Sequence, residues 1–201
     1  MLNPTILLPM KKLVLGSNSP RRKELLSQAG FEFEVFTTEV DESSDQDLSN
    51  MDLAVYLARK KNLIYRESLA TNVVLTADTV VISKENVLGK PLNRQEAVEM
   101  LKSMSDSFHK VITGVCISSS SKLVCFDDTT LVHFRKLTES EIESYVDKYQ
   151  PYDKAGGYGI QEWIGMIAID QIKGSYYNVM GLPIHKVYEC LAKDFGIHAK
   201  L

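Results

Sequence analysis

The sequence predicts an α/β fold with a mixed, twisted β-sheet flanked by helices, and three observations support this prediction. Short apolar runs with the length of buried strands alternate along the chain with amphipathic segments that have the helical period. Such alternation of strands and helices is typical of α/β proteins. Residues 110–137 instead suggest consecutive strands that begin with a hairpin, which favours a mixed sheet over a purely parallel one. The 201 residues, 44% of them hydrophobic, suffice for one domain or two small lobes with an ample core.

The first predicted unit is a strand, a tight turn and a helix between residues 12 and 30. The apolar run at residues 13–15 predicts a buried strand, and residues 16–18 (Gly-Ser-Asn) have turn chemistry. Ser19 is a good N-cap, and Pro20 suits the first helical position because its missing N–H would have no partner there. Gly30 is a standard signal for the end of this helix.

Two arginines fall in the first turn of that helix and point to an anion site. Arg21 and Arg22 lie at the end of the helix dipole that disfavours cations. A bound phosphate would offset this, because the two guanidinium groups, the hydroxyls of Ser17 and Ser19 and free N–H groups converge there. The alternative is that both arginines pair with nearby carboxylates.

The next segments contain two strands, an acidic loop and a helix. Residues 31–36 alternate apolar and charged side chains, which predicts a half-exposed strand, and residues 39–47 form an acidic loop. Residues 52–67 predict a helix, with basic side chains on its other faces and an apolar stripe made of Leu53, Tyr56, Leu57 and Ile64. Residues 73–82 predict one nearly continuous buried strand that contains the carboxylate of Asp78.

The remaining elements follow from turn and capping signals. We expect a turn at 88–92, then a helix that is capped by Asn93 with Glu96 and runs to Met104, then a hairpin of 110–118 with 122–126 and a strand at 130–137. A Thr138–Glu141 capping box opens the next helix, which ends before Pro151. The rest of the chain is expected to form a Gly-rich loop at 153–161, a strand-like segment at 163–172, a loop at 174–183 and a helix at 184–195 closed by Gly196.

Charge and composition exclude several classes of protein. The formal net charge is −3, which argues against a general nucleic-acid-binding protein, since such proteins are usually basic. Cys116, Cys125 and Cys190 are odd in number and lack C-x-x-C spacing, which predicts three reduced thiols in a cytosolic protein. The N-terminal apolar run is broken by prolines and lacks a cleavage site, so we expect no signal peptide, and no run could span a membrane. The four histidines have no zinc-ligand spacing.

Asp78 is the carboxylate that most needs an explanation. A charge inside an apolar strand is costly unless it is paired or binds a metal ion. Asp78 is therefore a candidate catalytic base or Mg²⁺ ligand, and the alternative is a partner for a buried lysine or for backbone donors. Glu42, with Asp41 and Asp45, could supply the hard oxygen ligands that Mg²⁺ prefers, although for this segment alone an ordinary solvated acidic loop is the more usual explanation.

Two lysines and one amide complete the candidate set. Lys90 could reach a phosphate from a turn that is held by Gly89 and Pro91. Lys61 could do the same, but a lysine on a helix is ordinarily a surface residue. Gln161 follows the Gly-rich loop, and its amide can both donate to and accept from one base edge, as uracil and thymine require. The alternative for Gln161 is an ordinary polar loop residue.

An ordered set of motifs resembles the Maf family of nucleoside triphosphate pyrophosphatases. The motifs are Ser17-Asn-Ser-Pro-Arg-Arg22, Ala77-Asp-Thr-Val80, Gly89-Lys-Pro91, Thr113-Gly114, Asp153-Lys-Ala-Gly-Gly-Tyr-Gly-Ile-Gln161 and Asn178-Val-Met-Gly-Leu-Pro183. They extend from about residue 12 to the C-terminal helix, and the P-R-R, A-D-T and Y-G-I-Q signatures look like the dTTP/UTP subgroup rather than the 7-methyl-GTP subgroup. Gly157 departs from the alanine that is common there, and residues 1–10 extend beyond the usual start.

The resemblance implies a fold and an activity. It implies one Maf-like domain over residues 1–201, with two lobes around a nucleotide-binding cleft as in ITPase-like proteins. The implied reaction is hydrolysis of dTTP and UTP, and of modified uridine triphosphates, between the α and β phosphates, which yields the monophosphate and pyrophosphate and cleans nucleotide pools. It also implies a cytoplasmic homodimer whose partner is a nucleoside triphosphate, with no nucleic acid and no membrane.

The resemblance also assigns roles to residues. It makes Asp78 the proton acceptor and places Glu42, Lys61 and Lys90 among the other active-site groups. The positions that set substrate choice are Arg21, Thr79 and Gln161, while Ser17, Ser19 and Arg22 help to hold the substrate. A divalent cation, Mg²⁺ or Mn²⁺, would be held by Glu42, Asp78 or both.

Two other functions remain open from the sequence. The same pocket could bind a nucleotide as a signal in a non-catalytic regulator of septum formation, a role to which family members have been linked. Nucleic-acid binding through Arg59, Lys60, Lys61 and Arg66 is the third reading, and the acidic balance of the chain disfavours it.

Overall fold

The computed structural model describes residues 12–38, 52–69 and 71–200, and the strands within these ranges form one seven-stranded sheet. The strands are β1 (Leu13–Leu15), β2 (Phe33–Val35), β3 (Val73–Ser83), β4 (Asn86–Leu88), β5 (Ser107–Ser118), β6 (Leu123–Phe134) and β7 (Ile169–Lys173). The helices are α1 (Pro20–Gln28), α2 (Asp52–Ser68), α3 (Arg94–Met104), α4 (Glu139–Tyr149), α5 (Trp163–Ala168), α6 (Tyr176–Met180) and α7 (Ile184–Phe195), with a 3₁₀ turn η1 at Ala155–Gly157.

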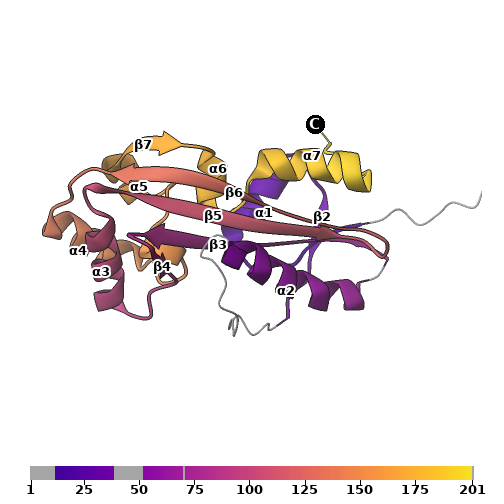
Figure 1. Ribbon diagram of the computed structural model, residues 1–201, viewed down its shortest axis with the longest axis horizontal. Coiled ribbons are helices and arrows are strands. Elements are labelled where there is room, and N and C mark those ends of the chain that lie inside the picture. The colour runs from indigo at the N-terminus through magenta and orange to yellow at the C-terminus, as the bar shows by residue number, and fades with distance from the viewer. Residues whose placement is uncertain (1–11, 39–51, 70, 201) are drawn as a thin grey trace, which may run out of the picture.

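The sheet is mixed, as expected. Its strand order is β2-β1-β3-β5-β6-β7, with β4 paired to β3 outside this path. β1 is parallel to β2 and to β3, and the remaining pairs are antiparallel. The long strands β3, β5 and β6 run through the whole molecule and join two lobes, one with α1, α2 and α7 and the other with α3, α4 and α5 (Figure 1). The two-lobed α/β architecture is therefore confirmed.

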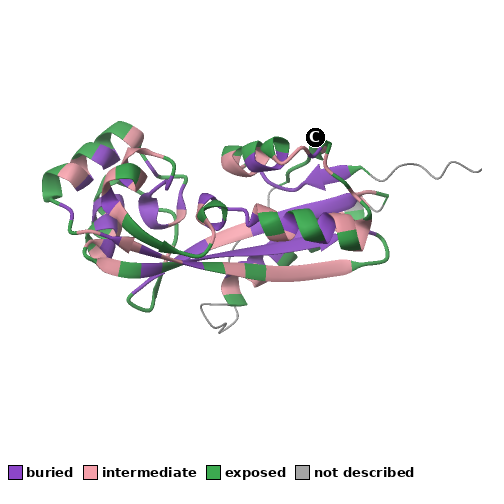
Figure 2. Ribbon diagram, turned by 90° about the horizontal axis from the view of Figure 1, so that it is seen from above, coloured by how far each residue is buried: buried purple, intermediate pink, exposed green. Residues whose placement is uncertain are grey.

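One apolar core runs through both lobes along the central strands. Most residues of β3 and β5 are buried, whereas most of β6 is intermediate or exposed, and the helices expose one face (Figure 2). In the first lobe α1 buries Leu25 and Leu26 against the sheet, and in the second lobe α4 buries Ile142 and Val146. A separate small cluster under α2 contains Ala54, Val80, Ile82 and Ile112. None of the helices in the described ranges combines the length and the apolar character that a membrane span requires.

A glycine in β5 brings α2 close to the sheet. A side chain at Gly114 would place its Cβ 2.3 Å from the backbone carbon of Ala54, so only glycine permits this approach. Gly114 is also the residue opposite Asp78 in the β3–β5 register. The close approach of α2 therefore occurs at the level of Asp78.

The buried face of α2 differs from the predicted one. The side chains that pack inward are Ala54, Leu57, Ala58, Asn62 and Tyr65, whereas the predicted stripe residue Ile64 is 39% exposed. Ala54 and Ala58 are small, which suits the close packing of this helix on the sheet. Asn62 is buried because its amide donates to the carbonyls of Val74 and Cys116 at 3.2 and 3.1 Å.

Several element boundaries also differ. The hairpin partner 122–126 and the strand at 130–137 are one continuous strand, β6, in which Asp127 and Asp128 keep their places in the ladder opposite Gly114 and Thr113. The segment at 163–172 was expected to be a strand, but residues 163–168 form the helix α5, and only β7 is extended. A six-residue apolar run is too short for its period to distinguish the two.

Smaller corrections concern turns and caps. The turn expected at 88–92 is preceded by a β3–β4 hairpin, and the loop at 174–183 contains the short helix α6. At the start of α3, Asn93 caps as expected, but the carboxylate of Glu96 accepts from the N–H of Leu92 at 2.9 Å. The Thr138–Glu141 capping box is confirmed in full.

The expectation of three reduced thiols is wrong. Cys116 and Cys125 lie directly opposite each other on β5 and β6, with their Cα atoms 4.2 Å apart, and they form a disulfide. Sequence spacing alone does not reveal this, because the pairing depends on the register of the two strands. Cys190 is a buried free thiol, and burial raises its pKa to about 11.

Candidate active site

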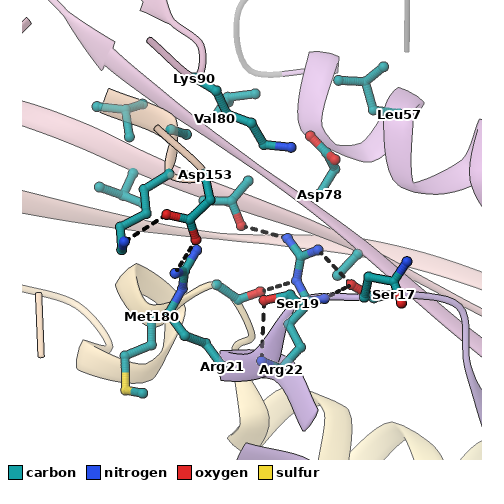
Figure 3. Close-up of a pocket in the computed structure, with 18 of the residues that line it drawn as sticks. Ser17, Ser19, Arg21, Arg22, Leu57, Asp78, Val80, Lys90, Asp153 and Met180 are labelled. Atoms are coloured by element: carbon teal, nitrogen blue, oxygen red, sulfur yellow. Dashed lines mark hydrogen bonds and ion pairs between the residues drawn. The ribbon is translucent and has the colours of Figure 1, made fainter. Parts of the chain in front are cut away.

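A cavity of about 650 Å³ opens between the two lobes. Its walls come from the turn before α1, the middle of β3, the loop after β4, the Gly-rich loop and the end of α6. The cavity brings together every predicted site residue that the structure describes: Ser17, Ser19, Arg21, Arg22, Lys61, Asp78, Thr79, Lys90 and Gln161. Glu42, the remaining predicted residue, lies outside the described residues. Several of these side chains converge on one space in Figure 3.

The N-terminus of α1 forms one wall, with the local structure that the sequence predicts. Ser19 caps the helix, and its side chain accepts a hydrogen bond from the backbone N–H of Arg22. The guanidinium of Arg22 donates to the carbonyl of Gly181 at 2.8 Å, to Ser17 Oγ at 3.2 Å and to Thr79 Oγ1 at 3.1 Å. Arg22 thus connects α1, β3 and the end of α6, as the dashed lines in Figure 3 show.

Arg21 has the carboxylate partner that the alternative reading expected. Its Nη1 lies 3.1 Å from Asp153 Oδ2, and Asp153 Oδ1 lies 2.7 Å from the amino group of Lys154. Partial burial opposes the charged form of Asp153, but the contacts with Lys154 and Arg21 outweigh it and lower the pKa of this carboxyl group. An anion that binds Arg21 therefore competes with Asp153.

The Gly-rich loop is held by a buried ionic network. Lys154 is 8% exposed and also lies 3.1 Å from Glu162 Oε1, while Tyr145 donates its hydroxyl hydrogen to Glu162. The backbone N–H of Gly159 donates to the Tyr145 hydroxyl at 3.1 Å. Burial, followed by the contact with Glu162, raises the pKa of Tyr145, so the phenol stays protonated. This network holds both ends of the segment that carries Gln161.

Asp78 pairs with Lys61 on the floor of the cavity. Lys61 Nζ lies 2.5 Å from Asp78 Oδ1, and the two side chains are only 13% and 15% exposed. Lys61 is therefore no ordinary surface lysine, because the close approach of α2 to β3 places it against the carboxylate. Lys90 extends its amino group into the same space (Figure 3). The cavity floor thus combines one carboxylate with two amino groups.

Thr79 joins the cavity to buried polar groups behind it. Its Oγ1 lies 2.9 Å from Thr113 Oγ1, and the Thr113 hydroxyl donates to the carbonyl of Asn178 at 3.0 Å. Thr113 and Asn178 are both fully buried. Gln161 is exposed at the cavity wall.

A buried histidine lies behind the Gly-rich loop. His109 Nε2 and the Tyr158 hydroxyl are 2.8 Å apart, and Tyr158 lines the cavity. Burial, with a smaller effect from His133, lowers the pKa of His109 to about 3, so the imidazole is neutral at physiological pH. His109 therefore supports the cavity wall without contributing charge.

Sequence reasoning assigned no role to five buried or half-buried residues that hold the site in place. They are Thr113, Tyr145, Lys154, Glu162 and Asn178. Their identity as polar residues is visible in the sequence, and three of them fall inside the family-like motifs. Their burial depends on strand register and helix packing, so no local pattern could reveal it.

The cavity offers few ligands for a metal ion. Within the described ranges no group of three or more His, Cys, Asp or Glu side chains is suited to hold one. Asp78 supplies a hard oxygen donor at the cavity floor. Mg²⁺ commonly needs only one or two carboxylates when phosphate oxygens and water complete its shell, so Asp78 is compatible with such an ion.

Comparisons with known proteins give a consistent result. The family model described as Maf-like protein matches residues 12–194. A dTTP/UTP pyrophosphatase of Parabacteroides distasonis is 51% identical over 89% of this chain and 93% of the relative. A protein of the same name from Bacteroides fragilis is 49% identical over 88% of this chain and 93% of its own length. Another from Porphyromonas gingivalis is 49% identical over 92% of this chain and 94% of its own length. The solved Staphylococcus aureus Ham1 protein matches 62% of this chain and 72% of its own at 14% identity and a TM-score of 0.44, too low to support a comparison of function.

Proposed function

The chain belongs to the Maf family, and on that premise we propose that it is a nucleoside triphosphate pyrophosphatase that hydrolyses dTTP and UTP to the monophosphate and pyrophosphate. One observation carries the proposal: a carboxylate on the cavity floor lies among cationic side chains that suit a triphosphate. Modified uridine triphosphates, whose changes at C5 leave the paired edge intact, belong to the proposed substrate class. The proposed role is the cleaning of nucleotide pools.

The triphosphate is held by charge in this proposal. Arg21, Arg22, Lys61 and Lys90 supply positive charge around the cavity, and the N–H groups at the start of α1 add hydrogen-bond donors. Two of these cations already face carboxylates, Arg21 with Asp153 and Lys61 with Asp78. Phosphate binding therefore exchanges one anion for another at Arg21.

Asp78 is the group that we assign to the chemistry. As general base it takes a proton from the water that attacks the α-phosphorus, and the pyrophosphate leaves with the charge of the broken anhydride bond. A divalent cation, Mg²⁺ or Mn²⁺, held by Glu42, Asp78 or both would offset the negative charge on the phosphates. Lys61 holds the carboxylate of Asp78 in place through their ion pair.

We assign recognition of the base to Thr79 and Gln161, which line the same cavity as the phosphate-binding groups. The amide of Gln161 can donate to a carbonyl of uracil or thymine and accept from its N3–H group. Cytosine has the opposite arrangement at this edge, so a site built for uracil would leave its hydrogen-bonding groups mispaired with cytosine.

The rival proposal is a non-catalytic nucleotide-binding regulator. A site that only binds gains nothing from a carboxylate beside a triphosphate, because like charges repel, so the position of Asp78 favours the enzyme.

We further propose a homodimer in the cytoplasm with no nucleic-acid or membrane partner. The Cys116–Cys125 disulfide is unusual for a reducing compartment, so the redox state of this pair in cells tests the proposed location.

The proposed function is tested by incubating the protein with each NTP and dNTP and Mg²⁺ and by identifying the products. We expect pyrophosphate and monophosphate from dTTP and UTP, with much slower turnover of CTP and the purine nucleotides. Release of inorganic phosphate and a diphosphate would contradict the proposed bond cleavage. Tight binding of UTP without any turnover would favour the regulator.

A further inference from the structure

Four polar groups form a hydrogen-bonded chain that starts in the cavity and ends in the core. Arg22 Nη2 lies 3.1 Å from Thr79 Oγ1, which lies 2.9 Å from Thr113 Oγ1, which lies 3.0 Å from the carbonyl oxygen of Asn178. Thr79 lines the cavity and is half-buried, whereas Thr113 is fully buried and does not line the cavity. Thr113 therefore acts on any ligand only through Thr79.

The chemistry of its two ends sets the direction of every hydrogen bond in this chain. A guanidinium can only donate and a carbonyl can only accept. Thr113 has one hydroxyl hydrogen and uses it on the carbonyl of Asn178, so it must accept from Thr79. Thr79 in turn uses its only hydrogen on Thr113 and accepts from Arg22. The one hydrogen-bonding capacity that Thr79 retains toward the cavity is an acceptor lone pair.

Both ends of the chain are anchored on α6, which keeps the arrangement rigid. The side chain of Asn178 donates to the carbonyl of Val111 and to Thr130 Oγ1, both at 3.0 Å. Arg22 donates from Nε to the carbonyl of Gly181, the C-cap residue directly after α6, at 2.8 Å. The Thr79 hydroxyl therefore cannot turn its hydrogen toward the cavity without breaking a bond inside this closed arrangement.

We propose that Thr113 is a positioning residue that makes the Thr79 hydroxyl a hydrogen-bond acceptor toward the base and thereby sets the preference for uracil and thymine over cytosine. The N3 position of uracil and thymine carries a hydrogen, which an acceptor lone pair can receive. The N3 position of cytosine carries a lone pair, which would face the lone pair of Thr79. This inference rests on the proposed function, because it deepens the recognition of the base within the same site.

The test variant lets the hydroxyl hydrogen of Thr79 turn toward the cavity while the shape of the side chain at position 113 is kept. In Thr113→Val the Thr79 hydroxyl loses its acceptor and can turn its hydrogen toward cytosine N3. Valine has nearly the shape of threonine, and the carbonyl of Asn178 still accepts from the N–H of Gly181 at 2.9 Å, so the fold is expected to persist. Thr113→Ser restores the hydroxyl. Thr76→Val removes another fully buried threonine hydroxyl of the same sheet, which bonds to the carbonyl of Ala58 away from this chain, and serves as the matched control.

The measured quantity is the ratio of kcat/KM for UTP to kcat/KM for CTP. We expect Thr113→Val to lower this ratio about tenfold or more, mainly through a rise in kcat/KM for CTP, as expected for one mispaired hydrogen-bonding group. The wild-type ratio should persist in Thr113→Ser and in Thr76→Val. General structural damage would lower both activities and would not raise turnover of CTP.

An unchanged ratio in a folded Thr113→Val protein would overturn the inference while leaving the proposed function intact. If the valine variant does not fold, Thr113→Ala removes the same hydroxyl with less bulk, and the same criterion applies to it. Failure of the wild-type protein to release pyrophosphate from UTP would be a failure of the proposed function itself, and this inference would fall with it.

Discussion

Removal of the buried lysine in the Gly-rich loop tests the network that holds this loop in place. Lys154→Met keeps much of the apolar length of the side chain but removes the positive charge between Asp153 and Glu162. The side chain of Glu162 is 18% exposed and, among the described residues, would keep the Tyr145 hydroxyl as its hydrogen-bond donor, whereas that of Asp153 is 57% exposed and keeps Arg21. Breaking a fully buried ion pair costs about 3–5 kcal/mol, and an exposed pair contributes about 0–1 kcal/mol. Because Glu162 is mostly but not fully buried, we expect a loss of about 2–4 kcal/mol in the free energy of unfolding.

Urea denaturation of the wild type, Lys154→Met, Glu162→Gln and the double variant would measure this loss. The double variant carries no unpaired carboxylate at position 162, so it should recover stability relative to Lys154→Met. Lys12→Met is a matched control, because it removes an exposed pair with Glu34 and should cost less than about 1 kcal/mol. A loss below about 1 kcal/mol in Lys154→Met, with no coupling to Glu162→Gln, would refute the account of the network.

Three further predictions concern the framework of the site. Gly114→Ala should lower the free energy of unfolding, measured by urea denaturation, by at least about 3 kcal/mol, because the added Cβ would overlap the backbone of α2. Gly89→Ala is the control, because Gly89 has open space around it, and should change the free energy of unfolding by less than about 0.5 kcal/mol. Equal effects of the two substitutions would contradict this packing. Burial lowers the pKa of His109 to about 3 in the folded protein, so as pH falls below about 6.5 the unfolded chain takes up a proton that the folded chain excludes. The free energy of unfolding should therefore fall by up to about 1.4 kcal/mol per pH unit. In His109→Gln this slope should be shallower over the same pH range, and an identical slope would contradict the burial of a neutral imidazole. Alkylation of the denatured protein without reductant should label one thiol, since Cys116 and Cys125 are joined, and labelling of three would contradict the disulfide.

The parts of the site that follow from local chemistry could be predicted from the sequence. The strand, turn and capped helix around Ser19 depend on neighbouring residues, and the structure has them as expected. Asp78 could be recognised because a carboxylate inside an apolar strand is unusual, and it does lie on the cavity floor. The resemblance to a family added the order of the motifs, and the structure brings the described candidate site residues into one cavity.

The parts that depend on distant packing could not be predicted. Lys61 belongs to a helix whose periodicity indicated a surface position, and only the close approach at Gly114 places it against Asp78. The direction in which the Thr113 hydroxyl donates its hydrogen is set by the carbonyl of Asn178, which lies 65 positions further along the chain. The disulfide likewise depends on the β5–β6 register. In each case the controlling contact joins segments that no local pattern relates to one another.

The most direct test of the central claim compares Asp78→Asn with the wild type for release of pyrophosphate from dTTP and UTP. Asparagine keeps the shape of the side chain but cannot accept a proton from water. The account predicts a loss of at least about 10²-fold in kcat, the contribution typical of general base catalysis, with the fold and nucleotide binding retained. An Asp78→Asn protein that releases pyrophosphate at the wild-type rate would contradict the assignment of Asp78 as the catalytic carboxylate.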